Sequence, residues 1–221
     1  MSVRRFAAIG DVHAEDGRLA KALERLALYR LDTILCVGDV VDGRGDPARC
    51  CRLLQKARVQ TVRGNHERWL VNGEMRDLPM ATADMTMDAG SWAFLAQLPA
   101  TRRIDTIAGP LLLCHGIGDD DMARVLPDDP LTELGPLAQL LASDYEIVLG
   151  GHTHQRMVRG ASGLTLLNAG TLAPDGGAHV LICDLEQRAV EFLDFDGDEH
   201  LVDGPRYEFG RPGDDIWGGS W

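Results

Sequence analysis

Side chains that can bind metal ions arrive in five short clusters, and each cluster contains a glycine. The clusters read Gly10-Asp11-Val12-His13, Gly38-Asp39-Val40-Val41-Asp42-Gly43, Gly64-Asn65-His66-Glu67, Cys114-His115-Gly116 and Gly150-Gly151-His152-Thr153-His154. Each follows a short run rich in Val, Ile, Leu or Ala, which is typical of a loop at the C-terminal end of a buried strand. Because ligands of open α/β sheets bind at that edge, five such loops can converge on one site.

Strand-like and helix-like patterns alternate along the first third of the chain. Residues 5–9, 33–37 and 59–62 form runs of strand length, while 18–29 and 47–56 carry apolar residues at helical spacing. Parallel strands need long crossovers, and helices usually provide them. The alternation therefore predicts a parallel sheet with helices packed against it.

The pattern changes in the rest of the chain. Interrupted helices are expected over 67–98 and a helix over 131–141; strands are expected at 111–114, 146–149, 156–159, 164–168, 179–184 and 189–195. Turn residues separate the last four strands, which favours antiparallel pairing. We expect one main domain over 1–195. An acidic tail rich in Gly and Pro follows over 196–221, either disordered or docked through its tryptophans.

Composition limits the possible partners. The length of 221 residues suits a single domain. A net charge of −12 argues against binding along a nucleic-acid backbone, because that mode uses clusters of Lys and Arg. No apolar stretch approaches the roughly 20 residues that cross a bilayer, and no secretory leader is visible. We therefore expect a soluble cytoplasmic protein that binds neither membrane nor long nucleic acid.

Five of the seven histidines lie inside the clusters, which makes them candidate metal ligands. His179 and His200 lie outside and are interpreted as structural or surface residues. A mixed set of Asp, Asn and His suits manganese, iron or zinc better than calcium, which prefers all-oxygen shells. His152 and His154 would share one face of an extended segment, unless a turn after the preceding glycines aims them at neighbouring ions.

The five cysteines are odd in number and lack a Cys-x-x-Cys pair, which disfavours a disulfide framework and a zinc knuckle. Cys114 directly precedes His115, and adjacent residues on a strand point to opposite faces. A small buried side chain is therefore favoured at Cys114 over a nucleophile paired with that histidine.

The order of the clusters resembles the calcineurin-like metallophosphoesterase superfamily. Its pattern of Asp-x-His, Gly-Asp-x-x-Asp, Gly-Asn-His, a lone His and Gly-His-x-His is matched from Asp11 to His154. The Asn-Ala-Gly-Thr segment at 168–171 is similar to an Asn-Pro-Gly-Ser segment of small bacterial members. The resemblance implies an α/β fold of two packed mixed β-sheets flanked by α-helices, an α-β-β-α sandwich, with the catalytic domain over 1–195.

The resemblance also implies a site for two first-row metal ions, with manganese favoured and iron or zinc as alternatives. One ion would be held by Asp11, His13 and His154. The other would be held by Asn65, His115 and His152, and Asp39 would bridge the two.

The remaining implied roles concern the substrate. His66 would stay off the metals beside the leaving-group oxygen, with its ring oriented by Asp42. Asn65 and Arg44 would contact the substrate, a small phosphorylated molecule or a phosphoprotein. The implied enzyme is a metal-dependent phosphoric ester hydrolase, in which a metal-bridging hydroxide attacks a phosphomonoester or phosphodiester in line. His66 would protonate the departing oxygen.

One departure from the pattern concerns substrate choice. In Ser/Thr protein phosphatases and dinucleoside polyphosphate hydrolases of this superfamily, an arginine usually follows the second aspartate and grips phosphate with two hydrogen bonds. Here that place is Gly43, and Arg44 comes one residue later, although Glu67 after His66 is similar to the protein phosphatase branch. Both enzyme types stay open, as does a catalytically silent scaffold. Loss of ligand histidines would indicate the scaffold, and none is lost.

Overall fold

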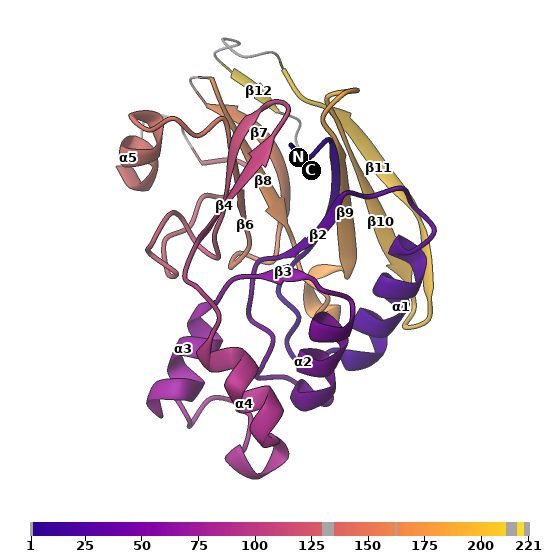
Figure 1. Ribbon diagram of the computed structural model, residues 1–221, viewed down its shortest axis with the longest axis vertical. Coiled ribbons are helices and arrows are strands. Elements are labelled where there is room, and N and C mark those ends of the chain that lie inside the picture. The colour runs from indigo at the N-terminus through magenta and orange to yellow at the C-terminus, as the bar shows by residue number, and fades with distance from the viewer. Residues whose placement is uncertain (1, 130–134, 162, 211–215, 219–221) are drawn as a thin grey trace.

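The computed structural model describes residues 2–129, 135–161, 163–210 and 216–218. Within these residues, two six-stranded mixed sheets pack against each other and helices lie outside them (Figure 1). The predicted α-β-β-α sandwich is confirmed. None of the described helices is long and apolar enough to cross a membrane.

The first sheet has the order β11-β10-β9-β1-β2-β3. Its strands are β1 (Arg5–Ile9), β2 (Thr33–Cys36), β3 (Gln60–Thr61), β9 (His179–Asp184), β10 (Ala189–Asp196) and β11 (His200–Glu208). The strands β1, β2 and β3 pair in parallel, and the helices α1 (Asp16–Leu26) and α2 (Pro47–Lys56) form the crossovers, as the alternation predicted. β9, β10 and β11 continue the sheet in antiparallel fashion.

The second sheet has the order β12-β7-β8-β6-β5-β4. Its strands are β4 (Arg102–Thr106), β5 (Gly109–Leu113), β6 (Ile147–Gly150), β7 (Arg156–Ala161), β8 (Leu164–Ala169) and β12 (Ile216–Gly218). β5, β6 and β8 pair in parallel, whereas β4 and β7 pair antiparallel to their neighbours. The last four predicted strands pair as expected, β7 antiparallel to β8 and β9 antiparallel to β10, but the two pairs lie in different sheets, and β8 also pairs in parallel with β6.

Two helices lie below the first sheet in Figure 1, α3 (Asn65–Asn72) and α4 (Ala89–Ala96). α3 ends at Gly73, whose φ of 71° is left-handed and stops the helix. Of the helix expected over 131–141, residues 131–134 lie outside the described residues; the remainder is the 3₁₀ turn η3 (Gly135–Leu137) and α5 (Ala138–Leu141). Two further 3₁₀ turns are η1 (Asp84–Thr86) and η4 (Pro174–Gly176).

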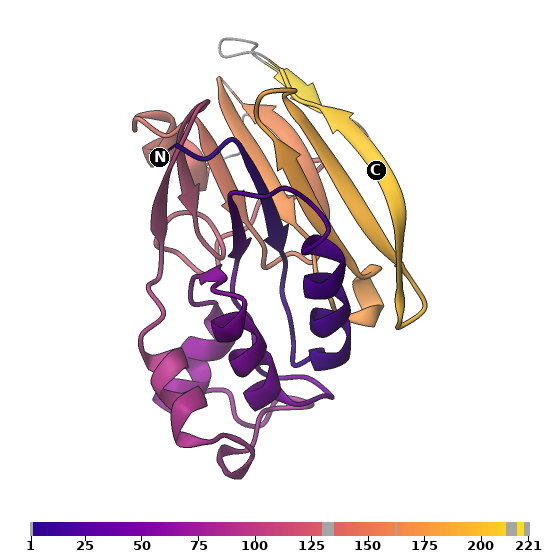
Figure 2. The same ribbon diagram turned by 45° about the vertical axis from the view of Figure 1, so that its right-hand side comes forward.

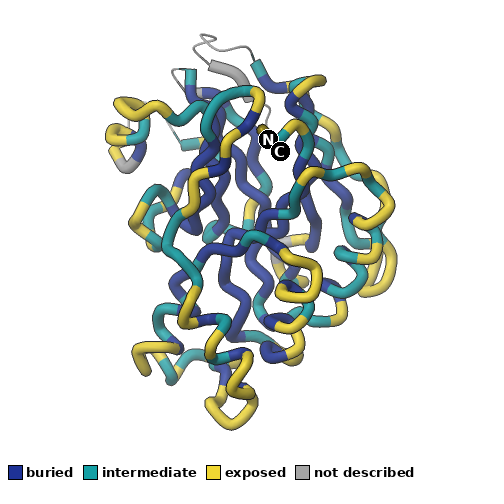
Figure 3. Tube along the Cα trace, in the orientation of Figure 1, coloured by how far each residue is buried: buried dark blue, intermediate teal, exposed yellow. Residues whose placement is uncertain are grey.

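The core has three layers. Side chains from both sheets, such as Phe6, Leu35 and Leu149, fill the space between them. A second layer lies between the first sheet and α1, α2 and α4, and a third lies between the second sheet and the segment of η3 and α5. Figure 2 shows the helices beside the first sheet, and Figure 3 shows that the most buried parts of the chain run through the sheets. Each parallel strand is thus buried on both faces, which explains the continuous apolar runs in the sequence.

The boundary proposed at residue 196 stays a prediction. Within the segment 196–221, β11 pairs with β10 and β12 pairs with β7, so backbone hydrogen bonds attach both strands to the sheets. These two strands are therefore docked on the sheets.

Candidate metal centre

The five predicted clusters meet at one end of the two sheets, the lower end in Figure 1. The loops after β1, β2 and β3 deliver their side chains from the first sheet, and those after β5 and β6 deliver theirs from the second. The candidate donors are Asp11, His13, Asp39, Asn65, His115, His152 and His154. The structure brings all seven together, so the site depends on the packing of one sheet against the other.

Asp11, His13 and His154 form one group of donors. The Nε2 atom of His154 lies 3.2 Å from Asp11 Oδ2 and 3.0 Å from His13 Nε2. Asp11 is fully buried, yet its Oδ2 atom has no hydrogen-bond partner among the residues that the structure describes. A buried carboxylate oxygen without a partner is costly, and a bound cation would satisfy it.

Asn65, His115 and His152 form a second group. The side-chain oxygen of Asn65 lies 2.9 Å from His115 Nε2 and 3.1 Å from His152 Nδ1. His115 is held in place by its other ring nitrogen, which lies 2.8 Å from the backbone oxygen of Val37. An orienting contact of this kind is usual for histidines that bind metals.

Asp39 lies between the two groups. Its Oδ2 atom is 3.3 Å from His115 Nε2 and 3.8 Å from His13 Nε2. Burial opposes ionisation, but the surrounding imidazoles hold the pKa of Asp39 well below its usual range. Burial likewise works against charge on His115, and the attraction of Asp39 outweighs it and raises the pKa of His115 to about 10. This anionic pocket therefore favours positive charge, as protons or as cations.

The donor set fits metal ions. Three overlapping triplets each bring their ligand atoms within 4.8 Å of one another: Asp11, His13 and His154; His13, Asp39 and His66; Asp11, Asp39 and His115. These residues offer the nitrogen and oxygen atoms that first-row ions bind. Asp11, His13 and Asp39 each belong to two of the triplets, so the candidate ligands form one continuous cluster.

Left-handed backbone conformations concentrate in these loops. Positive φ angles occur at His13, Asp39, Asp42, His152 and His154, with values of 45°, 47°, 60°, 65° and 59°. Such conformations are unfavourable for residues other than glycine and persist where the surrounding structure enforces them. His152 and His154 therefore lie on a turn, not on the extended segment considered above, and they face different groups of donors.

Two glycines permit the close approach of carboxylates. A Cβ atom on Gly64 would lie 2.1 Å from Asp39 Oδ1, and one on Gly151 would lie 2.4 Å from Asp11 Oδ1. Neither position can carry a side chain without moving a candidate ligand.

His66 and Asp42 form a hydrogen-bonded pair beside the donors. The Nδ1–H group of His66 donates to Asp42 Oδ2 over 2.8 Å, and the Nε2 atom of His66 lies 3.9 Å from Asp39 Oδ2. Burial lowers the pKa of His66, but the hydrogen bond to Asp42 and the charge of Asp39 raise it overall. Burial acts in the opposite sense on Asp42, where hydrogen bonds from His66, Arg76 and Thr82 hold the pKa well below its usual range.

Arg76, rather than Arg44, contacts the His66–Asp42 pair. Arg44 is exposed, on the loop between Gly43 and Gly45. Arg76 binds Asp42 instead, with Nη1 3.0 Å from Oδ1 and Nη2 2.9 Å from Oδ2. Sequence analysis missed Arg76, because no motif distinguishes it from other arginines in a loop. The role proposed for Arg44 as a substrate contact stays a prediction.

Gly43 explains why no arginine follows Asp42. A Cβ atom on Gly43 would lie 1.7 Å from the backbone oxygen of His13. Real Cβ atoms do not approach an oxygen so closely, so this loop admits only glycine.

Outside the donor set, the predicted structural residues are buried. All five cysteines are free and buried, and burial raises the pKa of Cys114 to about 12, which confirms the structural interpretation. His179 is also buried, and its Nδ1–H donates to the backbone oxygen of Gly177. In the 168–171 segment, Asn168 donates to the backbone oxygen of Gly151, and Thr171 donates to that of Asp11.

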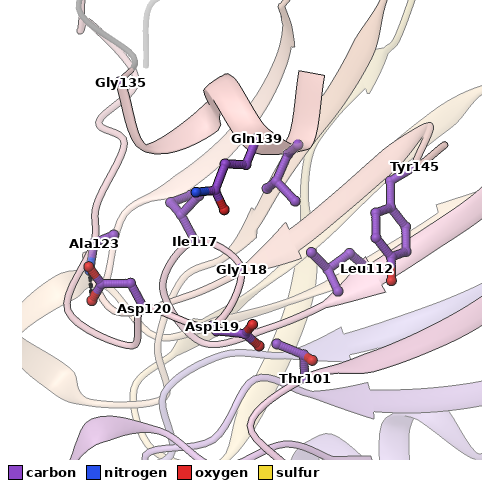
Figure 4. A pocket seen from close by; sticks show the side chains of 11 residues that line it. Thr101, Leu112, Ile117, Gly118, Asp119, Asp120, Ala123, Gly135, Gln139 and Tyr145 are labelled. Carbon is purple, nitrogen blue, oxygen red and sulfur yellow. Dashed lines mark hydrogen bonds between the residues drawn. The ribbon is translucent and has the colours of Figure 1, made fainter. Parts of the chain in front are cut away.

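A separate pocket of about 480 Å³ lies beside the loop that follows His115 (Figure 4). It is lined by Thr101, Leu112, Ile117, Gly118, Asp119, Asp120, Ala123, Gly135, Gln139, Leu140 and Tyr145. No candidate metal ligand lines this pocket, so it is distinct from the metal centre.

Comparison with known proteins agrees with this geometry. The sequence model of the calcineurin-like phosphoesterase superfamily domain matches residues 5–188. The chain therefore belongs to the calcineurin-like phosphoesterase superfamily.

Solved structures share the fold at low sequence identity. A metallophosphoesterase from Sphaerobacter thermophilus is 21% identical, with a TM-score of 0.68 over 88% of this chain and 89% of that chain. The Escherichia coli phosphoesterase Yfce is 16% identical, with a TM-score of 0.57 over 93% and 100%. Vps29 from Entamoeba histolytica, solved with Zn²⁺, is 19% identical, with a TM-score of 0.58 over 93% and 99%.

Proposed function

We propose that the protein is a dinuclear metal phosphoesterase that hydrolyses a phosphomonoester or phosphodiester. The observation that carries this proposal is the convergence of seven residues with oxygen and nitrogen donors from both sheets beside a His–Asp pair. Asp11, His13 and His154 would hold one ion, and Asn65, His115 and His152 the other. Asp39 lies between the two groups and would bridge them.

Bound cations would lower the pKa of water and polarise the phosphoryl oxygens. The protein itself would supply the proton for the leaving group. Nδ1 of His66 is hydrogen-bonded to Asp42, and Nε2 is therefore the ring nitrogen that faces the metal-ligand candidates. The raised pKa of His66 favours a proton there, and Asp42 stabilises the resulting imidazolium.

We propose manganese as the native metal, with iron or zinc as the alternatives that the same donors accept. The proposed substrate is a small phosphorylated molecule or a phosphoprotein. The net charge of −12 supports neither a membrane surface nor a long nucleic acid as partner.

The test is hydrolysis by metal-stripped protein after manganese, iron or zinc is restored. p-Nitrophenyl phosphate reports monoesterase activity, while bis-p-nitrophenyl phosphate and p-nitrophenyl phenylphosphonate report diesterase activity. Turnover that needs restored metal supports the proposal, and the ratio of the rates separates phosphatase from phosphodiesterase. Two bound ions without turnover on any of the three substrates would instead support a scaffold.

A further inference from the structure

The side chain of Arg76 makes hydrogen bonds to other residues of the protein. Its Nη1 and Nη2 atoms donate to the two carboxylate oxygens of Asp42, at 3.0 and 2.9 Å. Its Nε atom donates to the backbone oxygen of Glu74 at 2.7 Å. All three guanidinium nitrogens thus have a protein partner, and the contact with Asp42 is the bidentate kind that fixes a carboxylate in one orientation.

Glu74 helps to place Arg76 beside the His66–Asp42 pair. Its backbone amide donates to the backbone oxygen of Trp69, which turns the chain back after α3. Its carboxylate accepts from Arg68 at 3.2 Å and from Asn72 at 3.2 Å. These contacts hold Glu74 against the end of α3. Arg76 follows two residues later, and its side chain reaches Asp42.

The orientation of the Asp42 carboxylate depends on its hydrogen bonds to the protein. Its side chain is only 2% exposed, so its oxygens cannot exchange protein partners for water. Besides Arg76, Oδ1 accepts from the backbone amide of Thr82 at 2.7 Å, and Oδ2 accepts from His66 at 2.8 Å. Arg76 is the contact that touches both oxygens, and it therefore opposes rotation of the carboxylate away from His66.

We propose that Arg76 is a positioning residue that holds the Asp42 carboxylate against His66 Nδ1 and so aims His66 Nε2 at the leaving group. This inference rests on the proposed phosphoesterase function. In the reaction, the oxygen of hydroxide forms a new bond to phosphorus while the P–O bond to the leaving group breaks. The electron pair of the broken bond goes to the departing oxygen, and the Nε2 proton of His66 passes to that oxygen. A guanidinium used in this way would not grip the phosphate of the substrate directly.

Leaving groups of different basicity test the inference. Phenol needs a proton as it departs, whereas 2,4-dinitrophenol does not. With phenyl phosphate, we expect Arg76→Met to lower kcat by roughly 10- to 100-fold, part of the roughly 10²- to 10⁴-fold that a positioned acid contributes. With 2,4-dinitrophenyl phosphate, kcat should fall by less than about threefold on the same grounds, and KM should change little for either substrate.

Two further variants make the kinetic result specific. In a His66→Asn background, Arg76→Met should lower kcat little further, because both substitutions remove the same contribution. Arg103→Met is the matched control, because Arg103 lies on β4 of the second sheet, outside this network, and makes a similar bidentate contact with Asp144 at 2.9 and 2.8 Å. A rise in KM for both substrates, additive with His66→Asn, would show that Arg76 binds the substrate and would overturn the proposal.

Nuclear magnetic resonance tests the orientation without turnover. In metal-free protein, the Nδ1 proton of His66 should resonate downfield and be identifiable by its loss in His66→Asn. Arg76→Met should shift or broaden this resonance, and Arg103→Met should leave it in place. An unchanged resonance in Arg76→Met would overturn the inference. Failure of the wild-type protein to hydrolyse any ester would overturn the proposed function instead, and the resonance would still decide the role of Arg76.

Discussion

The carboxylate of Glu67 accepts a hydrogen bond of 2.8 Å from the backbone amide of Asp39, so the residue after His66 supports the candidate bridging ligand. The same carboxylate accepts from the amides of Val40 at 2.6 Å, Val41 at 3.1 Å and Gly64 at 2.9 Å. Glu67 is fully buried and joins the loops that follow β2 and β3. Burial, reinforced by the charge of Asp39, raises its pKa to about 7.

Replacing Glu67 by Gln should weaken both folding and metal binding. The amide group of Gln would place a donor against backbone donors, which costs roughly 1–3 kcal/mol in the free energy of unfolding. Displacement of Asp39 should lower metal affinity by about 10- to 100-fold, as is typical for residues that orient ligands. Urea denaturation and metal titration measure the two effects. Glu24→Gln, on the exposed face of α1, is the control; an equal loss there would refute the special role of Glu67.

Substitution of a candidate ligand and substitution of the candidate acid should have different effects: the first should lower the metal content, and the second should lower kcat alone. Asp39→Asn should reduce the metal content below two ions per chain, because Asp39 lies between both groups of donors. His66→Asn should keep both ions and lower kcat by roughly 10²- to 10⁴-fold. Elemental analysis of the purified variants gives the metal content, and assays with saturating metal give kcat. A parallel loss of metal and activity in His66→Asn would make His66 a ligand.

An arginine introduced at residue 43 should not restore the phosphate grip of the protein phosphatases. Gly43→Arg would force a Cβ atom against the backbone oxygen of His13, and overpacking of this kind costs about 1–3 kcal/mol or more. Thermal denaturation should show a lowered Tm. Gly17→Ala provides the contrast, because nothing lies within 4 Å of a Cβ atom at that helical position. A Gly43→Arg protein as stable as the wild type would show that the loop can move.

His179 should make the metal-free protein less stable as the pH falls. Burial and the positive charge of Arg156 lower its pKa from 6.5 to about 4. Below pH 6.5 the unfolded chain binds a proton that the folded chain does not, so stability is lost progressively between pH 6.5 and about 4. The shift corresponds to roughly 3 kcal/mol in the free energy of unfolding.

The measurement is urea denaturation at pH 7 and pH 4.5, with EDTA present, for the wild type and His179→Gln. The variant should lose less stability between the two pH values, because glutamine does not titrate. Equal losses in both proteins would show that other groups govern the acid sensitivity.

The sequence predicted the central strands well because their apolar runs are buried on both faces. Strands β1 and β9 have the predicted boundaries, and β2 differs by one residue. β4 was missed, since three of its five residues, including Arg102 and Asp105, are exposed at the edge of the second sheet. β11 was missed for a related reason: it is an edge strand whose residues are all exposed or partly exposed, and it contains Pro205.

At the site, the sequence predicted residue types but not the contacts that orient them. The motifs identified His66 and Asp42 as a pair, and the structure brings them to 2.8 Å. Arg76 was invisible because its contact with Asp42 joins residues 34 positions apart through an irregular segment. Hydrogen bonds of this kind depend on tertiary packing, which local periodicity does not encode.

The left-handed backbone at His13, Asp39, His152 and His154 affects how mutagenesis at this site should be read. Asparagine and glycine tolerate such φ angles, whereas alanine adds conformational strain that has no connection with metal chemistry. Alanine substitutions would combine the loss of a ligand atom with a backbone penalty and so overstate the contribution of each side chain. Asparagine at the histidines and glycine at Asp39 remove or replace the ligand while leaving the loop relaxed, and these substitutions measure the ligands themselves.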